Sequence, residues 1–163
     1  MPHKYLLKEF EDFSGSAATP EILMQYIAQR IHMHIPRYNW VGFYLTSKKD
    51  SSTLTLGPYT GSFTPNPTIS LSEGLCGSAA TTGRVVVADN VAEDPRYIQI
   101  SDLVKSQIVV PITVVGKVVA ILNVESYFMS AFKPPIERDF VETCAKLVAK
   151  CFAKNTAMSL VHA

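Results

Sequence analysis

The stretch Ser106–Glu125, SQIVVPITVVGKVVAILNVE, decides the fold of this chain. Two runs within it, 106–114 and 117–125, are rich in β-branched residues and are typical of strands. Between them, Val115-Gly116 has the length and the glycine of a two-residue turn. The stretch therefore predicts a β-hairpin, and with it an antiparallel pair of strands.

Amphipathic helices are predicted at both ends of the chain. Thr19-Pro20-Glu21 marks a helix start, with threonine as the N-cap, and Pro36 closes that helix. A short helix within residues 1–18 precedes it, and a long helix runs from about Pro135 to Lys154 near the end. The side chains expected on the three apolar faces are Tyr5, Leu6, Phe10 and Phe13; Ile22, Leu23, Tyr26, Ile27 and Ile31; and Phe140, Val141, Cys144, Leu147, Val148, Cys151 and Phe152.

Short strands are predicted between these helices. Residues 57–68 contain several glycines and prolines, which predict an irregular loop there. The other expected elements are strands over 40–45, 53–56 and 84–88 and a short helix over 78–83. Strand and helix do not alternate regularly. The sequence thus predicts one α+β domain over residues 1–163, an antiparallel sheet flanked by N- and C-terminal helices.

Composition argues against several functional classes. The hydrophobic fraction is 47%, the charged fraction 18% and the net charge +1, which gives no electrostatic basis for binding nucleic acid or a membrane surface. No apolar run is long enough to cross a bilayer and the N-terminus has no secretory pattern, so we expect a cytoplasmic protein. The 3 cysteines and 4 histidines lack metal-ligand spacing, so we expect no metal and no cofactor. The histidines, expected at the surface, are His3, His32, His34 and His162.

Cys76 lies between two glycines in the segment 73–80, EGLCGSAA, at an expected junction of loop and helix. Glycine allows the backbone to approach a ligand closely, and the start of a helix lowers the pKa of a nearby thiol. The segment is therefore compatible with a redox site, an anion-binding cradle or a tight turn. Cys144 and Cys151 share a helix face and are expected to pack in the core or in a dimer seam.

Several segments together resemble a GAF domain. They are residues 39–44 (NWVGFY), 56–61 (LGPYTG), 74–80 (GLCGSAA), 109–112 (VVPI) and 116–126 (GKVVAILNVES). Within that superfamily they are most similar to free methionine-R-sulfoxide reductase, and the first two segments carry the more specific part of the likeness. The resemblance covers nearly the whole chain and implies a GAF fold with a ligand pocket.

The same resemblance implies that reductase chemistry has been lost. The family places its catalytic cysteine just before the Ile-Val-Val-Pro strand, where counting without gaps gives Ile100 here. Of the family's resolving cysteines only Cys76 is present, because the loop 61–67 has no thiol. Acidic residues that hold the substrate's ammonium group also differ: one glutamate is Gln107, one aspartate is Asn123, and another aspartate is the longer Glu125. An amide keeps its hydrogen bonds but loses the charge that pairs with an ammonium group.

The ligand pocket is expected beneath the loops at 57–76 and 90–105. Its expected lining is Trp40, Tyr44, Tyr59, Cys76, Gln107, Asn123 and Glu125. For the aromatic residues the alternative is plain packing in the core. For Gln107, Asn123 and Glu125 the alternative is a solvated strand end. Gly42, inside the strand that carries Trp40, indicates a bulge or the close approach of another group.

Three functions remain open on the sequence. The leading interpretation is a small-molecule-binding GAF module, sensory or regulatory, that is a catalytically inactive relative of the reductase. The alternative is a divergent methionine sulfoxide reductase that uses Cys76 and an external reductant. The third is an interaction protein whose empty GAF fold only dimerises through its helices. The expected partners are a small polar ligand and a second copy of the chain in a homodimer.

Overall fold

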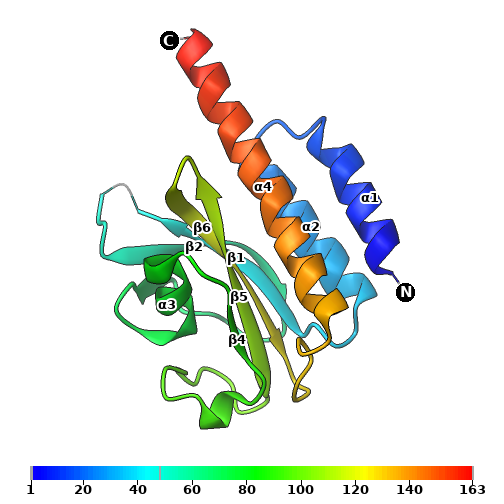
Figure 1. Ribbon diagram of the computed structural model, residues 1–163, viewed down its shortest axis with the longest axis vertical. Coiled ribbons are helices and arrows are strands. Elements are labelled where there is room, and N and C mark those ends of the chain that lie inside the picture. Colours follow the sequence, from blue (N-terminus) through cyan, green and yellow to red (C-terminus); the bar gives the residue numbers. More distant parts are fainter. Residues whose placement is uncertain (1, 48, 163) are drawn as a thin grey trace.

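The structure is a computed structural model that describes residues 2–47 and 49–162, with side chains described as far as residue 156 (Figure 1). The elements in chain order are α1 His3–Ser14, α2 Pro20–His34, β1 Trp40–Thr46, β2 Thr53–Gly61, β3 Thr68–Ser70, α3 Gly74–Thr82, β4 Val86–Ala88, the 3₁₀ turn Val91–Glu93, β5 Ser106–Val114, β6 Lys117–Ser126 and α4 Pro135–His162.

The strands form one antiparallel sheet in the order β3-β2-β1-β6-β5-β4. Helices α2 and α4 cover one face of the sheet, α1 packs against these two helices, and α3 with its neighbouring loops covers the other face (Figure 1). This arrangement confirms the α+β prediction of an antiparallel sheet flanked by N- and C-terminal helices.

Alternation along the strands divides the apolar side chains into two layers. On β1, Val41 and Phe43 pack in the layer beneath the three large helices. Trp40 and Tyr44, which alternate with them, pack in a smaller layer on the α3 side. The strands β5 and β6 divide their residues in the same way, so any polar side chain on the α3 side of the sheet faces this smaller layer.

The hairpin predicted from residues 106–125 is present as β5 and β6. Its turn residues Val115 and Gly116 have φ values of 49° and 75°. Positive φ at both central positions is the pattern of the type I′ turn, whose twist matches that of the flanking strands. Valine is an unusual occupant of this conformation, because its branched Cβ crowds the backbone there.

The second strand is longer than predicted. Gly57-Pro58 does not end it, and β2 continues through Gly61 along β1. The register shifts by one residue between the pairs Gly42↔Tyr59 and Tyr44↔Leu56, which leaves an extra residue on β2. Pro58 falls in this irregularity, and a bulge tolerates proline because the ladder is already interrupted there.

The helix predictions need smaller corrections. The α2 helix begins as expected, with Thr19 Oγ1 accepting a hydrogen bond from the Ile22 amide at 3.2 Å. However, Tyr5 is 81% and Ile22 46% exposed, so both were wrongly assigned to apolar faces. Each is one residue, about 100° around the helix, from a buried leucine, so only the narrower stripe reaches the core.

Three other elements differ in length from the prediction. The helix α3 starts at Gly74 rather than at residue 78, and the strand after it is shortened to Val86–Ala88. The helix α4 extends to His162, and its end projects past the sheet (Figure 1).

His3 was wrongly expected at the surface. It is 7% exposed, and its Nε2 lies 2.6 Å from Glu137 Oε2 in the first turn of α4. Tyr38 donates a hydrogen bond of 2.5 Å to the same carboxylate oxygen. The three side chains join the start of α1 to the start of α4. His32 is half-buried and His34 is exposed, while the side chain of His162 lies outside the described residues.

Candidate functional site

A cavity of about 130 Å³ lies on the α3 face of the sheet. The strands β1, β5 and β6 form its floor, and the segments 63–76 and 97–100 form its walls. Six of the seven residues expected in the pocket line this one cavity. They are Trp40, Tyr44, Cys76, Gln107, Asn123 and Glu125.

Strand register explains why these residues meet. Glu125 lies opposite Trp40 on β1 and opposite Gln107 on β5. Asn123, two residues earlier on β6, lies opposite Gly42. Because side chains two apart on a strand share a face, all of these positions point to the α3 side.

Trp40 forms the aromatic part of the floor and depends on two glycines. A Cβ atom at Gly42 would lie 2.5 Å from Trp40 Cη2, and one at Gly61 would also collide with the indole ring. Both glycines therefore leave room for the ring to lie flat on the sheet. The expectation of a close approach at Gly42 is borne out, and the approaching group is Trp40 itself.

Tyr59 is the one expected residue that does not line the cavity. It is 40% exposed and stacks on Trp40, with ring centroids 5.5 Å apart and planes 13° from parallel. Its position on β2 places it opposite Gly42, next to the indole. Tyr59 therefore supports the aromatic floor from outside the cavity.

Two amides meet at the centre of the floor. Gln107 Nε2 donates to Asn123 Oδ1 at 2.8 Å and lies 4.0 Å from Cys76 Sγ. The other end of the Gln107 amide, Oε1, is buried without a hydrogen-bond partner. Since buried polar atoms are nearly always hydrogen-bonded, this acceptor is available to a ligand.

Glu125 is the buried acid of the site. It is 6% exposed, and burial raises its pKa from 4.5 to about 7. Taking a carboxylate out of water disfavours its charged form, which is the cause of this shift. A donor group brought by a ligand would compensate for that lost hydration.

Cys76 is the third residue of α3 and is 5% exposed. Its place near the start of a helix favours a lowered pKa, but the burial of its sulfur has the larger effect. Burial first, and then the charge of Glu125, raise the thiol pKa well above its ordinary range. The sulfur is therefore a neutral thiol at physiological pH rather than a nucleophilic thiolate.

The loops over the cavity contribute Phe63, Asn66 and Ile98, which were not singled out from the sequence, and also Ile100. Tyr44 donates its hydroxyl to the Asn66 carbonyl at 2.8 Å, which ties the loop after β2 to the floor. Phe63 stacks on Trp40 at 5.8 Å and lines one wall. Ile98 and Ile100 line the opposite wall. Only the ranges of these loops could be predicted, because no periodic pattern assigns loop side chains to a face.

Cys144 and Cys151 are buried among the helices on the other face of the sheet, away from this cavity. In the described part of the chain, no group of three or more His, Cys, Asp or Glu side chains is arranged to hold a metal ion. Nor does any described helix have the length and hydropathy needed to cross a membrane.

The fold is an antiparallel sheet with large helices on one face and a cavity on the other, and sequence comparison assigns it to a family. A family model described as "GAF domain" matches residues 17–153. The chain belongs to the GAF domain family.

Its relatives include enzymes and proteins named without an activity. The chain is 34% identical over 113 residues to "Free methionine-R-sulfoxide reductase" of Saccharomyces cerevisiae, covering 69% of this chain and 62% of the yeast protein. It is 32% identical to "Protein YtsP" of Bacillus subtilis, covering 91% of each chain. Among solved structures, free methionine-R-sulfoxide reductase from Neisseria meningitidis in complex with its substrate superposes with a TM-score of 0.86 at 26% identity, covering 94% of this chain and 91% of the other.

Proposed function

We propose that this chain is a sensory or regulatory GAF module that binds a small molecule in the cavity between Trp40, Gln107 and Glu125 and does not reduce methionine sulfoxide. The observation that carries the proposal is the single buried thiol of the cavity. GAF domains bind small molecules, and a related reductase has been seen with its substrate bound, so a cavity of this kind favours a ligand site.

Thiol chemistry argues against turnover. Reduction of a sulfoxide begins with a thiolate that attacks the sulfur atom, and the resulting sulfenic acid is resolved by a second thiol. Cys76 alone among the 3 cysteines lines the cavity, and its pKa is raised. Ile100, which stands at the position that the resemblance gives to the catalytic cysteine, lines the same cavity with an unreactive side chain.

The charges of the site argue against the reductase substrate. Methionine sulfoxide carries an ammonium group, and the resemblance pairs that group with several acids. Here Gln107 and Asn123 are hydrogen-bonded to each other and carry no charge. Glu125 remains as the one buried acid of the floor, and burial disfavours its ionised form. Methionine sulfoxide therefore has fewer acids to hold its ammonium group here than the resemblance gives it, and no lysine, arginine or histidine of the described lining to hold its carboxylate.

A reductase assay on the protein and two variants tests this proposal. We expect no turnover of free methionine-R-sulfoxide with thioredoxin as reductant. Ile100→Cys places a thiol in the same cavity as Cys76 and is expected to gain measurable turnover, since a second thiol is then present at the site. Robust turnover by the unmodified protein that disappears in Cys76→Ser would overturn the proposal.

That last outcome would establish the second candidate function. One observation favours it: Cys76 lines the cavity and lies within 4.0 Å of Gln107 Nε2, so a bound sulfoxide would reach the thiol. In that case Cys76 would become the sulfenic acid, and an external thiol would supply the electrons that reduce it.

We also propose a homodimer and a single domain over residues 1–163. The apolar face of α4 does not by itself supply a dimer seam, because Phe140, Cys144 and Val148 are buried in the core of the chain. The support that remains is the end of α4, which projects beyond the sheet (Figure 1). Light scattering at micromolar concentration tests the dimer, and a monomeric mass would contradict it.

A further inference from the structure

We propose that the ligand of this cavity ends in a flat head group that carries two N–H donors, of the amidine or guanidine kind. This inference rests on the proposed function of the cavity as a ligand site and adds the chemical class of the ligand. Three features of the cavity point to that class: its acceptors, its charge and its aromatic floor.

Two hydrogen-bond acceptors lie next to each other on the floor. Gln107 and Glu125 are directly opposite on β5 and β6, and residues so placed have Cβ atoms about 5 Å apart. Gln107 Oε1 is buried and has no partner, while the nitrogen of the same amide donates to Asn123. A planar head group with two N–H bonds on one edge donates to both acceptors at once.

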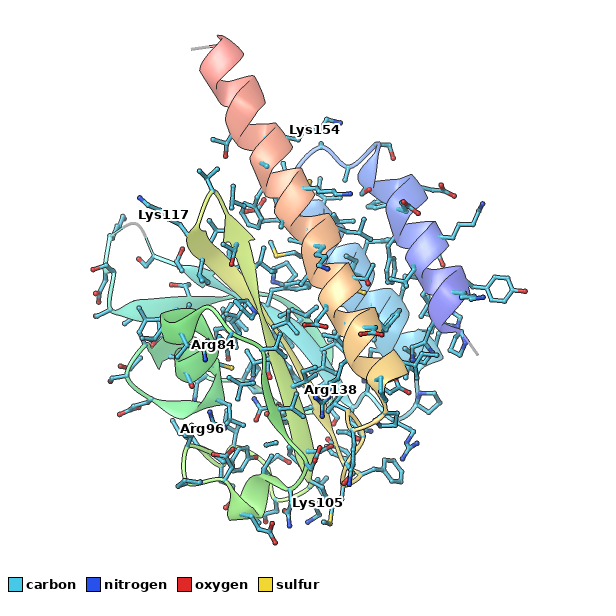
Figure 2. The ribbon with its side chains drawn as sticks, viewed as in Figure 1. Arg84, Arg96, Lys105, Lys117, Arg138 and Lys154 are labelled. Carbon is cyan, nitrogen blue, oxygen red and sulfur yellow. The ribbon has the colours of Figure 1, made fainter. Side chains whose placement is uncertain are left out.

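The charge of the lining favours a cation or a neutral donor. Glu125 and Glu73 are the ionisable acids among the described residues that line the cavity, and the same residues include no lysine, arginine or histidine. None of the basic residues labelled in Figure 2 lines the cavity, and Arg96, near α3, is paired with Asp94 at 2.8 Å. A carboxylate or phosphate would therefore meet acids without a compensating side-chain cation.

The aromatic floor favours a flat and delocalised group. The ring of Trp40 is within 25° of parallel to that of Tyr44 and within 17° of parallel to that of Phe63. All three rings line the cavity. A planar cation placed over such rings is stabilised by both stacking and cation–π attraction. A tetrahedral ammonium group has the cation–π attraction but no flat face with which to stack.

One feature opposes this inference. The helix α3 begins at the cavity with Gly74 and Leu75, and the start of a helix carries a partial positive charge that attracts anions. Glu73, the residue before it, places a carboxylate at the same end. The test must therefore compare a cation and an anion of the same shape.

Four compounds with the same ring and nearly the same outline provide that comparison: benzamidine, benzamide, acetophenone and benzoate. Their dissociation constants are measured by calorimetry at pH 8, where Glu125 is ionised. We expect benzamidine to bind most tightly, benzamide next, then acetophenone, with benzoate weakest. Because its hydrogen bond to Glu125 is charge-assisted, benzamidine is expected to have a dissociation constant about tenfold or more below that of acetophenone.

Variants assign the preference to the carboxylate. In Glu125→Gln the preference for benzamidine over benzamide is expected to fall by about tenfold, because the charge-assisted bond becomes a neutral one. The control Glu93→Gln removes one exposed acid outside the cavity and is expected to keep the full preference.

Benzoate binding as tight as benzamidine would overturn the inference and would indicate that the start of α3 dominates. An unchanged preference in Glu125→Gln, or no binding of any of the four compounds, would overturn it as well. After any of these outcomes, the proposed function of the cavity as a ligand site would still hold if the purified protein retains some other small molecule. Turnover of methionine sulfoxide by the unmodified protein would instead remove the proposed function itself.

Discussion

The replacement Glu125→Gln tests the electrostatics of the site without any ligand. Burial raises the pKa of Glu125 from 4.5 to about 7, so the folded protein holds this proton more tightly than the unfolded chain does. The stabilising effect of the proton is then fully present below pH 4.5. It is lost as the pH rises towards 7, and above 7 the acid is ionised in both states.

The size of the effect follows from the two pKa values. A tenfold difference in a proton equilibrium corresponds to about 1.4 kcal/mol. Between pH 5 and pH 8, linkage between an unfolded pKa of 4.5 and a folded pKa of about 7 predicts a loss of roughly 2.5 kcal/mol of stability from this one group. The neighbouring Tyr44 and Cys76 have raised pKa values and stay neutral over this range.

The assay is urea unfolding at pH 5, 6, 7 and 8 for the unmodified protein, Glu125→Gln and the control Glu93→Gln. The amide of the variant cannot titrate. Between pH 5 and pH 8, the free energy of unfolding should therefore fall by roughly 2.5 kcal/mol less in Glu125→Gln than in the unmodified protein. The control replaces an exposed acid and should follow the unmodified protein. Parallel pH profiles for all three proteins would refute the reasoning, because they would mean that Glu125 has the same pKa in the folded and unfolded states.

Two further predictions concern the backbone. Gly42→Ala should destabilise the fold by about 1–3 kcal/mol and change the fluorescence of Trp40, since the new methyl group collides with the indole. The control is Gly15→Ala, where a Cβ meets its nearest atom at an ordinary 3.5 Å. This control should leave the fluorescence unchanged. An unchanged melting temperature in Gly42→Ala would show that the ring can move aside. Val115→Asn should raise the free energy of unfolding by about 1 kcal/mol, because asparagine tolerates the positive φ of this turn, whereas loss of stability would contradict the turn assignment.

The sheet and most of the site could be predicted because strands encode their two faces by alternation. Ile121, Asn123 and Glu125 alternate with Leu122 and Val124, so once the hairpin was recognised, the polar residues were placed on one face. That pattern depends only on local sequence. It holds in the structure because the opposite face is packed beneath the large helices.

Features that depend on distant contacts could not be predicted. Nothing near His3 in the sequence indicates that Glu137 will meet it across the fold. Nothing near Gly57-Pro58 shows that β1 will pair past the bulge and carry the strand on to Gly61. Tyr59 was assigned to the pocket because its motif resembles that of the reductases, but its partner in the structure is the Trp40 ring.

Native mass spectrometry of the freshly purified protein tests the central claim most directly. If the cavity is a ligand site, the spectrum shows the chain together with a small molecule, and that mass is lost on denaturation and reduced in Glu125→Gln. The bare mass of the chain in every preparation, with no added small molecule retained, would contradict the account of this protein as a ligand-binding module.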